Sequence, residues 1–145
     1  MESILEYLTG DHRRIDTVYA QLEDAVVEKE EENIKKYYAD FSASMEKHLK
    51  GEEEIMFPAF EKTTGNSMGP TQVMRLEHGQ MRELISAMGR AVEANDNKKL
   101  QGLLETMMIL IQQHNMKEEQ ILYPMIDRTM GAEASELVGA MKNIS

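Results

Sequence analysis

One eleven-residue pattern occurs twice in this chain of 145 residues, and the two copies start 66 residues apart. They read His48-Leu-Lys-Gly-Glu-Glu-Glu-Ile-Met-Phe-Pro58 and His114-Asn-Met-Lys-Glu-Glu-Gln-Ile-Leu-Tyr-Pro124, with five positions identical. The other two histidines, His12 and His78, obey the same spacing. Each half of the chain therefore carries a lone histidine followed 36 residues later by a His-x-x-x-Glu motif, which predicts a pseudo-twofold site.

Apolar residues recur at three- and four-residue steps, and no stretch shows the period of two that indicates a strand. The four helices that this spacing predicts are separated by polar segments at residues 28–33, 63–70 and 95–97. Pro58 is expected to kink or end the second helix, and Gly131 to close the fourth before a short helix at about residues 132–141. Short connections favour antiparallel neighbours, so we predict an all-α, up-down-up-down four-helix bundle with a short C-terminal helix.

The length fits a single domain of residues 1–145, built from two αα-hairpin repeats of about residues 3–63 and 70–129. With 26 acidic against 16 basic residues, the net charge of −10 disfavours nucleic acid or an anionic membrane surface as a partner. No apolar run approaches the 18 residues of a membrane span and no leader pattern is present, so we expect a cytoplasmic protein. The chain has no cysteine, which leaves histidine and carboxylate as the strong metal ligands.

Residues four apart on a helix share one face, so each His-x-x-x-Glu can aim an imidazole and a carboxylate at the same point. The inward stripes continue beyond the glutamates to Ile55, Ala59, Ile121 and Met125. A single such pair is usually an exposed ion pair, and a lone histidine is usually a satisfied core residue. Here four inward histidines and two inward glutamates recur at constant spacing on stripes that are otherwise apolar. This combination favours metal ligation by six residues: His12, His48, Glu52, His78, His114 and Glu118. Burying two carboxylates among apolar residues is costly, and a bound cation would compensate that cost.

Four imidazoles and two carboxylates are too many for one tetrahedral zinc and too rich in nitrogen for calcium or magnesium. They suit two redox-active metals, each with two histidines, bridged by both glutamates and by an oxide or hydroxide, with one position vacant on each metal. Glu53 and Glu119 are rival bridges, but a residue five positions after a histidine lies about 140° around the helix from it.

About residues 3–130 resemble the hemerythrin-like, or HHE cation-binding, family. The resemblance lies in the order His12, His48-x-x-x-Glu52, His78 and His114-x-x-x-Glu118, with Glu-x-Ile-x-[Phe/Tyr]-Pro following each glutamate. It implies a left-handed four-helix bundle with a non-haem diiron centre. On this resemblance His12 and His48 bind one iron, His78 and His114 bind the other, and Glu52 and Glu118 bridge them.

Oxygen-carrying hemerythrins use five histidines and an aspartate, so the set of four histidines and two glutamates is more similar to the catalytic half of bacterial iron-centre repair proteins and to non-carrier hemerythrin-like proteins. The expected function is the binding of a small ligand, dioxygen, nitric oxide or peroxide, in sensing or stress response. Iron-centre repair or iron delivery and diiron redox catalysis are the alternatives, and the sequence does not choose among them.

Three aromatic residues, Tyr38, Phe57 and Tyr123, are expected mainly to pack in the core, with a wall of the site as their second role. For Gly51 two interpretations stay open. Either it leaves room for a small molecule to reach the metals, or it permits close helix packing.

Overall fold

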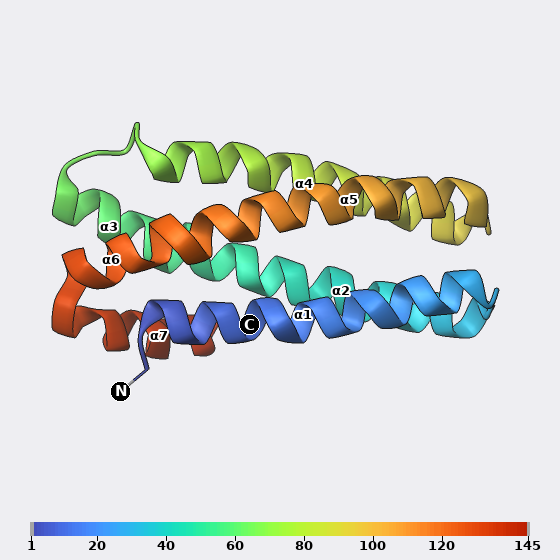
Figure 1. The fold of residues 1–145 in the computed structure, drawn as a ribbon, viewed down its shortest axis with the longest axis horizontal. Coiled ribbons are helices and arrows are strands. Elements are labelled where there is room, and N and C mark those ends of the chain that lie inside the picture. Colours follow the sequence, from blue (N-terminus) through green and yellow to red (C-terminus); the bar gives the residue numbers. More distant parts are fainter. Residues whose placement is uncertain (1, 145) are drawn as a thin grey trace.

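The computed structural model describes residues 2–144 and arranges them as an antiparallel helical bundle (Figure 1). Its four long helices are α1 (Ile4–Val27), α2 (Glu31–Gly51), α4 (Pro70–Glu93) and α5 (Asn97–Lys117). Two shorter helices, α3 (Phe57–Thr64) and α6 (Tyr123–Met130), continue α2 and α5. After a 3-10 turn at Gly131–Glu133, α7 (Ala134–Lys142) folds back beside α1 and α2 at the end of the bundle where the N-terminus lies. The predicted up-down-up-down bundle and the short C-terminal helix are confirmed.

Local sequence sets the start of α1. The Ser3 hydroxyl accepts a hydrogen bond from the Glu6 amide at 3.0 Å, and the Glu6 carboxylate accepts one from the Ser3 amide at 3.3 Å. This reciprocal pair is a capping box, which supplies partners that the first turn of a helix otherwise lacks. The Asp127 carboxylate of α6 accepts hydrogen bonds from the amides of Ile4 and Leu5, at 2.8 and 3.1 Å. These bonds join the start of α1 to α6.

The connections are short. The first spans only residues 28–30, because the acidic residues that follow it form the exposed first turn of α2, where negative charge is favourable. The third connection ends at Asp96, whose side chain accepts from the Lys99 amide at 3.1 Å. The second connection spans residues 65–69, within the loop predicted at 63–70, because α3 continues to Thr64 and α4 begins at Pro70. No described helix combines the length and apolar character that a membrane crossing requires.

Both copies of the eleven-residue pattern contain a π-helical turn, at Glu52–Met56 and Glu118–Leu122. At the end of each turn the amide of Phe57 or Tyr123 bonds to the carbonyl five residues earlier. A proline follows immediately, in the first turn of the next α-helix, where its missing amide hydrogen is not needed. The interruption expected near Pro58 is therefore confirmed as a π turn, and the fourth helix, predicted to run unbroken to Gly131, has the same interruption.

The π turns shift the buried face by one residue, and this corrects part of the predicted stripes. Ile121, predicted to point inward, is 58% exposed, whereas the next residue, Leu122, is buried. Ile55, Ala59 and Met125 are likewise only partly buried, and Met56, Phe60 and Ile126 take the core positions. An α-helical period does not hold across a turn that contains one extra residue.

The hydrophobic core has two parts, with the histidines and glutamates between them. One part lies between the four long helices and includes Ile15, Leu22 and Leu104. The other lies among α3, α6, α7 and the start of α1, and includes Ile4, Met56 and Ile126. The polar layer is therefore closed off by apolar packing along the bundle axis in both directions.

Candidate metal centre

All six predicted ligand residues meet in this polar layer. Each of the four long helices contributes one histidine, and Glu52 and Glu118 are the first residues of the two π turns. The rings of His12 and His48 have centroids 4.8 Å apart, and those of His78 and His114 are 5.1 Å apart. All six residues are at least 94% buried. Antiparallel packing therefore brings the lone histidine and the motif histidine of each half to the same level.

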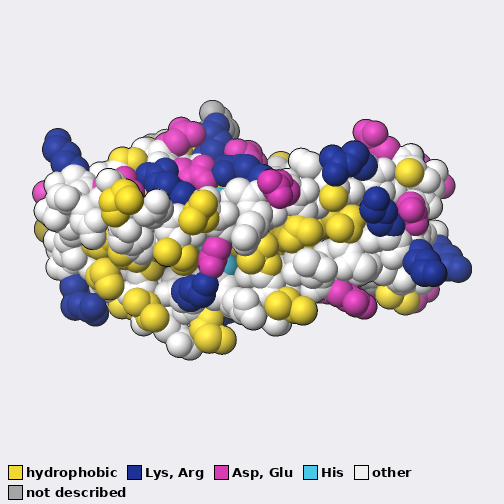
Figure 2. Space-filling view, turned by 90° about the horizontal axis from the view of Figure 1, so that it is seen from above, with side chains coloured by type: hydrophobic (Ala, Val, Ile, Leu, Met, Phe, Trp, Pro, Cys, Tyr) yellow, Lys and Arg dark blue, Asp and Glu magenta, His cyan; other side chains and the backbone are white. Residues whose placement is uncertain are grey.

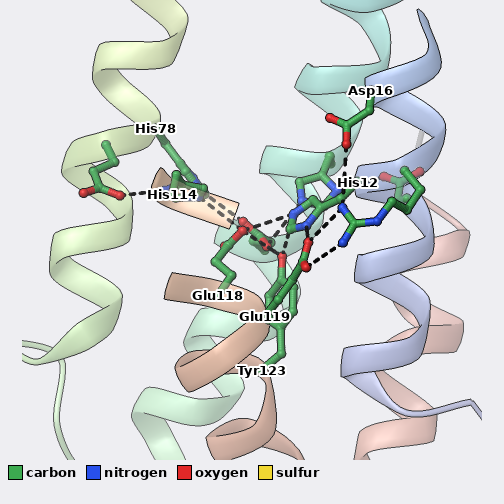
Figure 3. A network of polar contacts seen from close by, with 12 residues as sticks. His12, Asp16, His78, His114, Glu118, Glu119 and Tyr123 are labelled. Atoms are coloured by element: carbon green, nitrogen blue, oxygen red, sulfur yellow. Dashed lines mark hydrogen bonds and ion pairs between the residues drawn. The ribbon is translucent and has the colours of Figure 1, made fainter. Parts of the chain in front are cut away.

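Both glutamates contact a histidine of each pair, and Figure 3 shows Glu118 between His114 and His12. Glu52 Oε2 is 3.4 Å from His48 Nε2, and its Oε1 is 3.0 Å from His78 Nε2. Glu118 Oε1 is 3.2 Å from His12 Nε2 and 3.3 Å from His114 Nε2. Two groups result, each made of one histidine pair and both glutamates, with ligand atoms within 4.8 Å of one another.

The donor atoms suit a cation, and several of them have no other partner. Among the described residues, the buried atoms without a hydrogen-bond partner include His48 Nε2, His78 Nε2, His114 Nε2, Glu52 Oε1 and Glu118 Oε2. A buried polar atom without a partner is costly. Five such atoms around one point, all of types that ligate metals, indicate a site for a metal cation.

Behind each histidine lies a second carboxylate that accepts from the opposite ring nitrogen. Nδ1 is 2.7 Å from Glu119 in His12, 2.8 Å from Asp11 in His48, 2.7 Å from Glu53 in His78 and 2.7 Å from Glu77 in His114. A hydrogen bond from Nδ1 fixes the tautomer and leaves Nε2 as the metal donor. The rivals Glu53 and Glu119 therefore face the outer side of the rings, while Glu52 and Glu118 face the centre.

Arginine and lysine side chains donate hydrogen bonds to these outer carboxylates from the solvent side. Arg13 donates to Glu119 at 2.9 Å, Arg82 donates to Glu53 at 2.8 and 2.9 Å, and Lys117 lies 2.5 Å from Glu77. Arg14 contacts Asp11 at 3.0 Å. Figure 2 accordingly shows only a trace of histidine on one face, with acidic and basic side chains around it.

The charges of this cluster shift its pKa values strongly. Burial opposes protonation of His48, but the carboxylates of Glu52 and Asp11 outweigh it and raise the pKa to about 10. For His78 burial is likewise outweighed by Glu52 and Glu53, and the pKa rises to about 9. Burial would raise the pKa of Glu53, yet hydrogen bonds from His78 and Arg82 lower it to about 2. In the metal-free protein the rings of His48 and His78 thus carry positive charge that balances the buried carboxylates.

The three aromatic residues Tyr38, Phe57 and Tyr123 differ in what they contact. Tyr123 is fully buried and reaches the centre, where its hydroxyl donates to Glu52 and lies 2.8 Å from Glu118 Oε1 and 3.1 Å from His12 Nε2 (Figure 3). Phe57 stacks on His78 with centroids 5.7 Å apart. Tyr38 lies away from the centre, and its hydroxyl donates to the Ile85 carbonyl at 2.7 Å.

Two hollows adjoin the centre. A small cavity of about 10 Å³ touches three of the histidines and is otherwise lined mainly by Ile15, Met45, Leu49, Met81 and Ile111. A surface pocket of about 660 Å³ lies between α1, α2 and α7 and reaches the outer side of His48 and Asp11. Gly51 lines this pocket, and a Cβ there would meet Met141 Cγ of α7 at 3.4 Å. A Cβ at this position would thus be in ordinary van der Waals contact with α7, and a longer side chain would have to pack against Met141.

A bundle that buries four histidines and two glutamates in one layer defines a helical cation-binding protein. The chain belongs to the hemerythrin family, because the model of the hemerythrin HHE cation binding domain matches residues 3–126. It is 26% identical over 136 residues to an uncharacterized hemerythrin-like protein of Schizosaccharomyces pombe, and the match covers 93% of this chain and 64% of that protein. No solved structure matches the chain. The predicted family resemblance is confirmed.

Proposed function

We propose that the protein holds two non-haem iron ions and takes up a small ligand, dioxygen, nitric oxide or peroxide, in sensing or stress response. His12 and His48 would hold one iron, His78 and His114 the other, and Glu52 and Glu118 would lie between them. The observation that carries the proposal is the pair of ligand groups that share both glutamates. A single cation would be bound by one histidine pair only, and the other two imidazoles would have no ligand role.

A bound pair of irons would supply redox chemistry and positions for a small exogenous ligand. The residues of the chain supply the setting. The four outer carboxylates keep each Nε2 directed inward, and the two apolar core regions exclude bulk water from the polar layer. The exposed fraction of every ligand residue is 6% or less, so a charged or bulky substrate has no direct route to the centre.

The size of the inner cavity supports a small ligand. At about 10 Å³ it is close to the ~10–15 Å³ that one water molecule needs. Its lining is apolar apart from the histidines and two polar residues at its edge, Asp16 and Asn115. A diatomic molecule is compatible with this space, whereas an organic substrate is not.

The test begins with anaerobic reconstitution of the metal-free protein with Fe²⁺, followed by metal analysis. We expect two irons per chain in the wild type and in a Glu54→Gln control, which changes an exposed carboxylate beside the centre. We expect a loss of iron in Glu52→Gln. A folded wild-type protein that binds no iron would refute the proposal.

Addition of dioxygen or nitric oxide to the diferrous protein then separates the functions. A reversible charge-transfer spectrum supports ligand binding. Release of iron would favour iron delivery or repair, and repeated turnover of peroxide or nitric oxide would favour a redox enzyme.

A further inference from the structure

Among the residues that contact the four histidines through a carboxylate or a stacked ring, the 66-residue duplication differs in one polar group, the hydroxyl of Tyr123. It holds for the histidines, for the inner glutamates, and for the outer carboxylates, where Asp11 matches Glu77 and Glu53 matches Glu119. Phe57 and Tyr123 are also 66 residues apart, and each ring is buried against the lone histidine of the opposite half. Only Tyr123 brings a hydroxyl into the polar layer.

Two of the three polar atoms that the Tyr123 hydroxyl contacts belong to one side of the centre, and the third, Glu118 Oε1 at 2.8 Å, faces both His12 and His114. The hydroxyl lies 3.1 Å from His12 Nε2, and it donates to Glu52 Oε2, the oxygen that faces His48 at 3.4 Å. The other oxygen of Glu52 faces His78 at 3.0 Å and has no hydrogen-bond partner among the described residues. The hydroxyl thus contacts two atoms that face only the His12–His48 position, and it contacts none that faces only the His78–His114 position.

The unpartnered nitrogens give the same asymmetry. Among residues 2–144 the Nε2 atoms of His78 and His114 both lack a hydrogen-bond partner, whereas on the other side His48 Nε2 lacks one and His12 Nε2 has the Tyr123 hydroxyl. At the pseudo-equivalent place beside His78 stands the phenyl ring of Phe57, which has no polar atom to offer. The two cation positions therefore have the same ligand types but different neighbours.

We propose that Tyr123 is a positioning residue that makes the two cation positions inequivalent, so that the His78–His114 position fills before the His12–His48 position. The inference rests on the proposed dimetal centre. A cation at the His12–His48 position must displace the hydroxyl from Glu52 Oε2, to which it donates its single proton, and from its place 3.1 Å from His12 Nε2. A hydrogen bond to a charged group corresponds to about a tenfold to hundredfold change in binding. The hydroxyl should weaken this position by that factor.

The test is a titration of the metal-free protein with Co²⁺, followed by visible absorption and calorimetry. Repulsion between two cations separates the binding steps in every variant, so the informative quantity is the change in that separation. Tyr123→Phe keeps the ring and removes the hydroxyl, and we expect the two dissociation constants to approach each other by about tenfold or more. Phe57→Tyr supplies a matching hydroxyl to the other position and should also bring the constants together, by weakening the first step.

The double variant Phe57→Tyr/Tyr123→Phe exchanges the two side chains. We expect two separated steps again, with the order of filling reversed. The position that fills first is identified from the imidazole N–H signals that paramagnetic Co²⁺ shifts in the NMR spectrum, assigned with His48→Gln and His114→Gln. This reversal would not follow from a purely structural role of the tyrosine.

If the two dissociation constants stay equally far apart in Tyr123→Phe, or if the exchanged variant fills in the wild-type order, the inference is wrong. The proposed dimetal centre would still hold in either case, provided that two ions bind. If Tyr123→Phe does not fold, unchanged steps in Phe57→Tyr alone would overturn it. A folded wild-type protein without bound Co²⁺ would overturn the centre and the inference together.

Discussion

Each imidazole of the centre depends on a carboxylate on its outer side, and these four residues were not predicted from the sequence. The signal was present, because Asp11 and Glu77 each precede a lone histidine and Glu53 and Glu119 each follow an inner glutamate. Repetition alone, however, does not say which ring a carboxylate faces. The contact of Glu53 with His78 arises only when α2 and its π turn pack against α4.

Removal of one outer charge should weaken metal binding without removing a ligand. In Glu53→Gln the His78 ring loses its charged acceptor at 2.7 Å, and Arg82 loses one of its two carboxylate partners and keeps Glu46. We expect metal affinity to fall by about 10- to 100-fold. Competition with a chelator of known affinity measures this, with Glu54→Gln as the matched exposed control. Equal affinities in the two variants would contradict the role of Glu53.

The histidine pKa values predict proton release when metal binds. At pH 7.5 the rings of His48 and His78 are protonated in the metal-free protein, since their pKa values are about 10 and 9, and a metal-binding ring must be neutral. Binding should therefore release at least two protons per chain, and affinity should rise with pH until about pH 9–10. Calorimetry in buffers of different ionisation enthalpy counts the protons. Release of none would contradict the assignment.

The same shifts act on stability in the opposite sense. Because the folded-state pKa values of His48 and His78 are raised, their contribution to the stability of the metal-free protein is complete below about pH 6.5. It is lost as the pH rises through 9 and 10. Metal binding and metal-free stability should therefore have opposite pH dependences in this range.

At the scale of elements, the sequence predicted the helices and the interruption at Pro58 but not the geometry of that interruption. The prediction of buried faces assumes 3.6 residues per turn, and a π turn violates the assumption locally. The consequence for the centre is direct, because Tyr123 lies five residues after Glu118 and still bonds to it at 2.8 Å. The sequence predicted core packing as the main role of Tyr123 and a wall of the site as its second role, but it did not predict the contact with Glu118.

Two glycines of the helices provide a matched pair for testing the packing of α7. Gly51 is buried, and a Cβ there would lie 3.4 Å from Met141 Cγ, whereas Gly79 is exposed and a Cβ there would meet nothing within 4 Å. We expect Gly51→Leu to lower the free energy of unfolding by ~1–3 kcal/mol through overpacking against α7. Gly79→Leu should be neutral or stabilising by up to ~1 kcal/mol. Denaturant unfolding compares them, and equal stability of the two variants would contradict this packing.

At the scale of the whole molecule, topology followed from the sequence because the duplication and the short connections leave few arrangements. Two hairpins of the same design, each with histidines that must face inward, favour one antiparallel bundle. The division of the core into two apolar regions around the polar layer could not be predicted in detail. It depends on α7 closing one end, and nothing in the spacing of α7 fixes where it packs.

Removal of metal should lower the stability of the whole bundle. A ligand at 100 times its dissociation constant stabilises the folded state by about 2.7 kcal/mol, which corresponds to about 5–10 °C in Tm for a chain of this size. We expect a chelator to lower Tm by this amount in the iron-loaded wild type. The His48→Ala/His114→Ala variant, which lacks one ligand of each pair, should show little response. An unchanged Tm in the wild type would place the cation elsewhere.

The outer carboxylates cross between the hairpins in half of their contacts. His12 relies on Glu119 and His78 relies on Glu53, each from the opposite repeat, while Asp11 and Glu77 serve histidines of their own repeat. Any separation of the two hairpins would therefore disorient one imidazole of each pair at the same moment. Docking of the two repeats and binding of metal should therefore be coupled, because the orientation of His12 and His78 requires both hairpins.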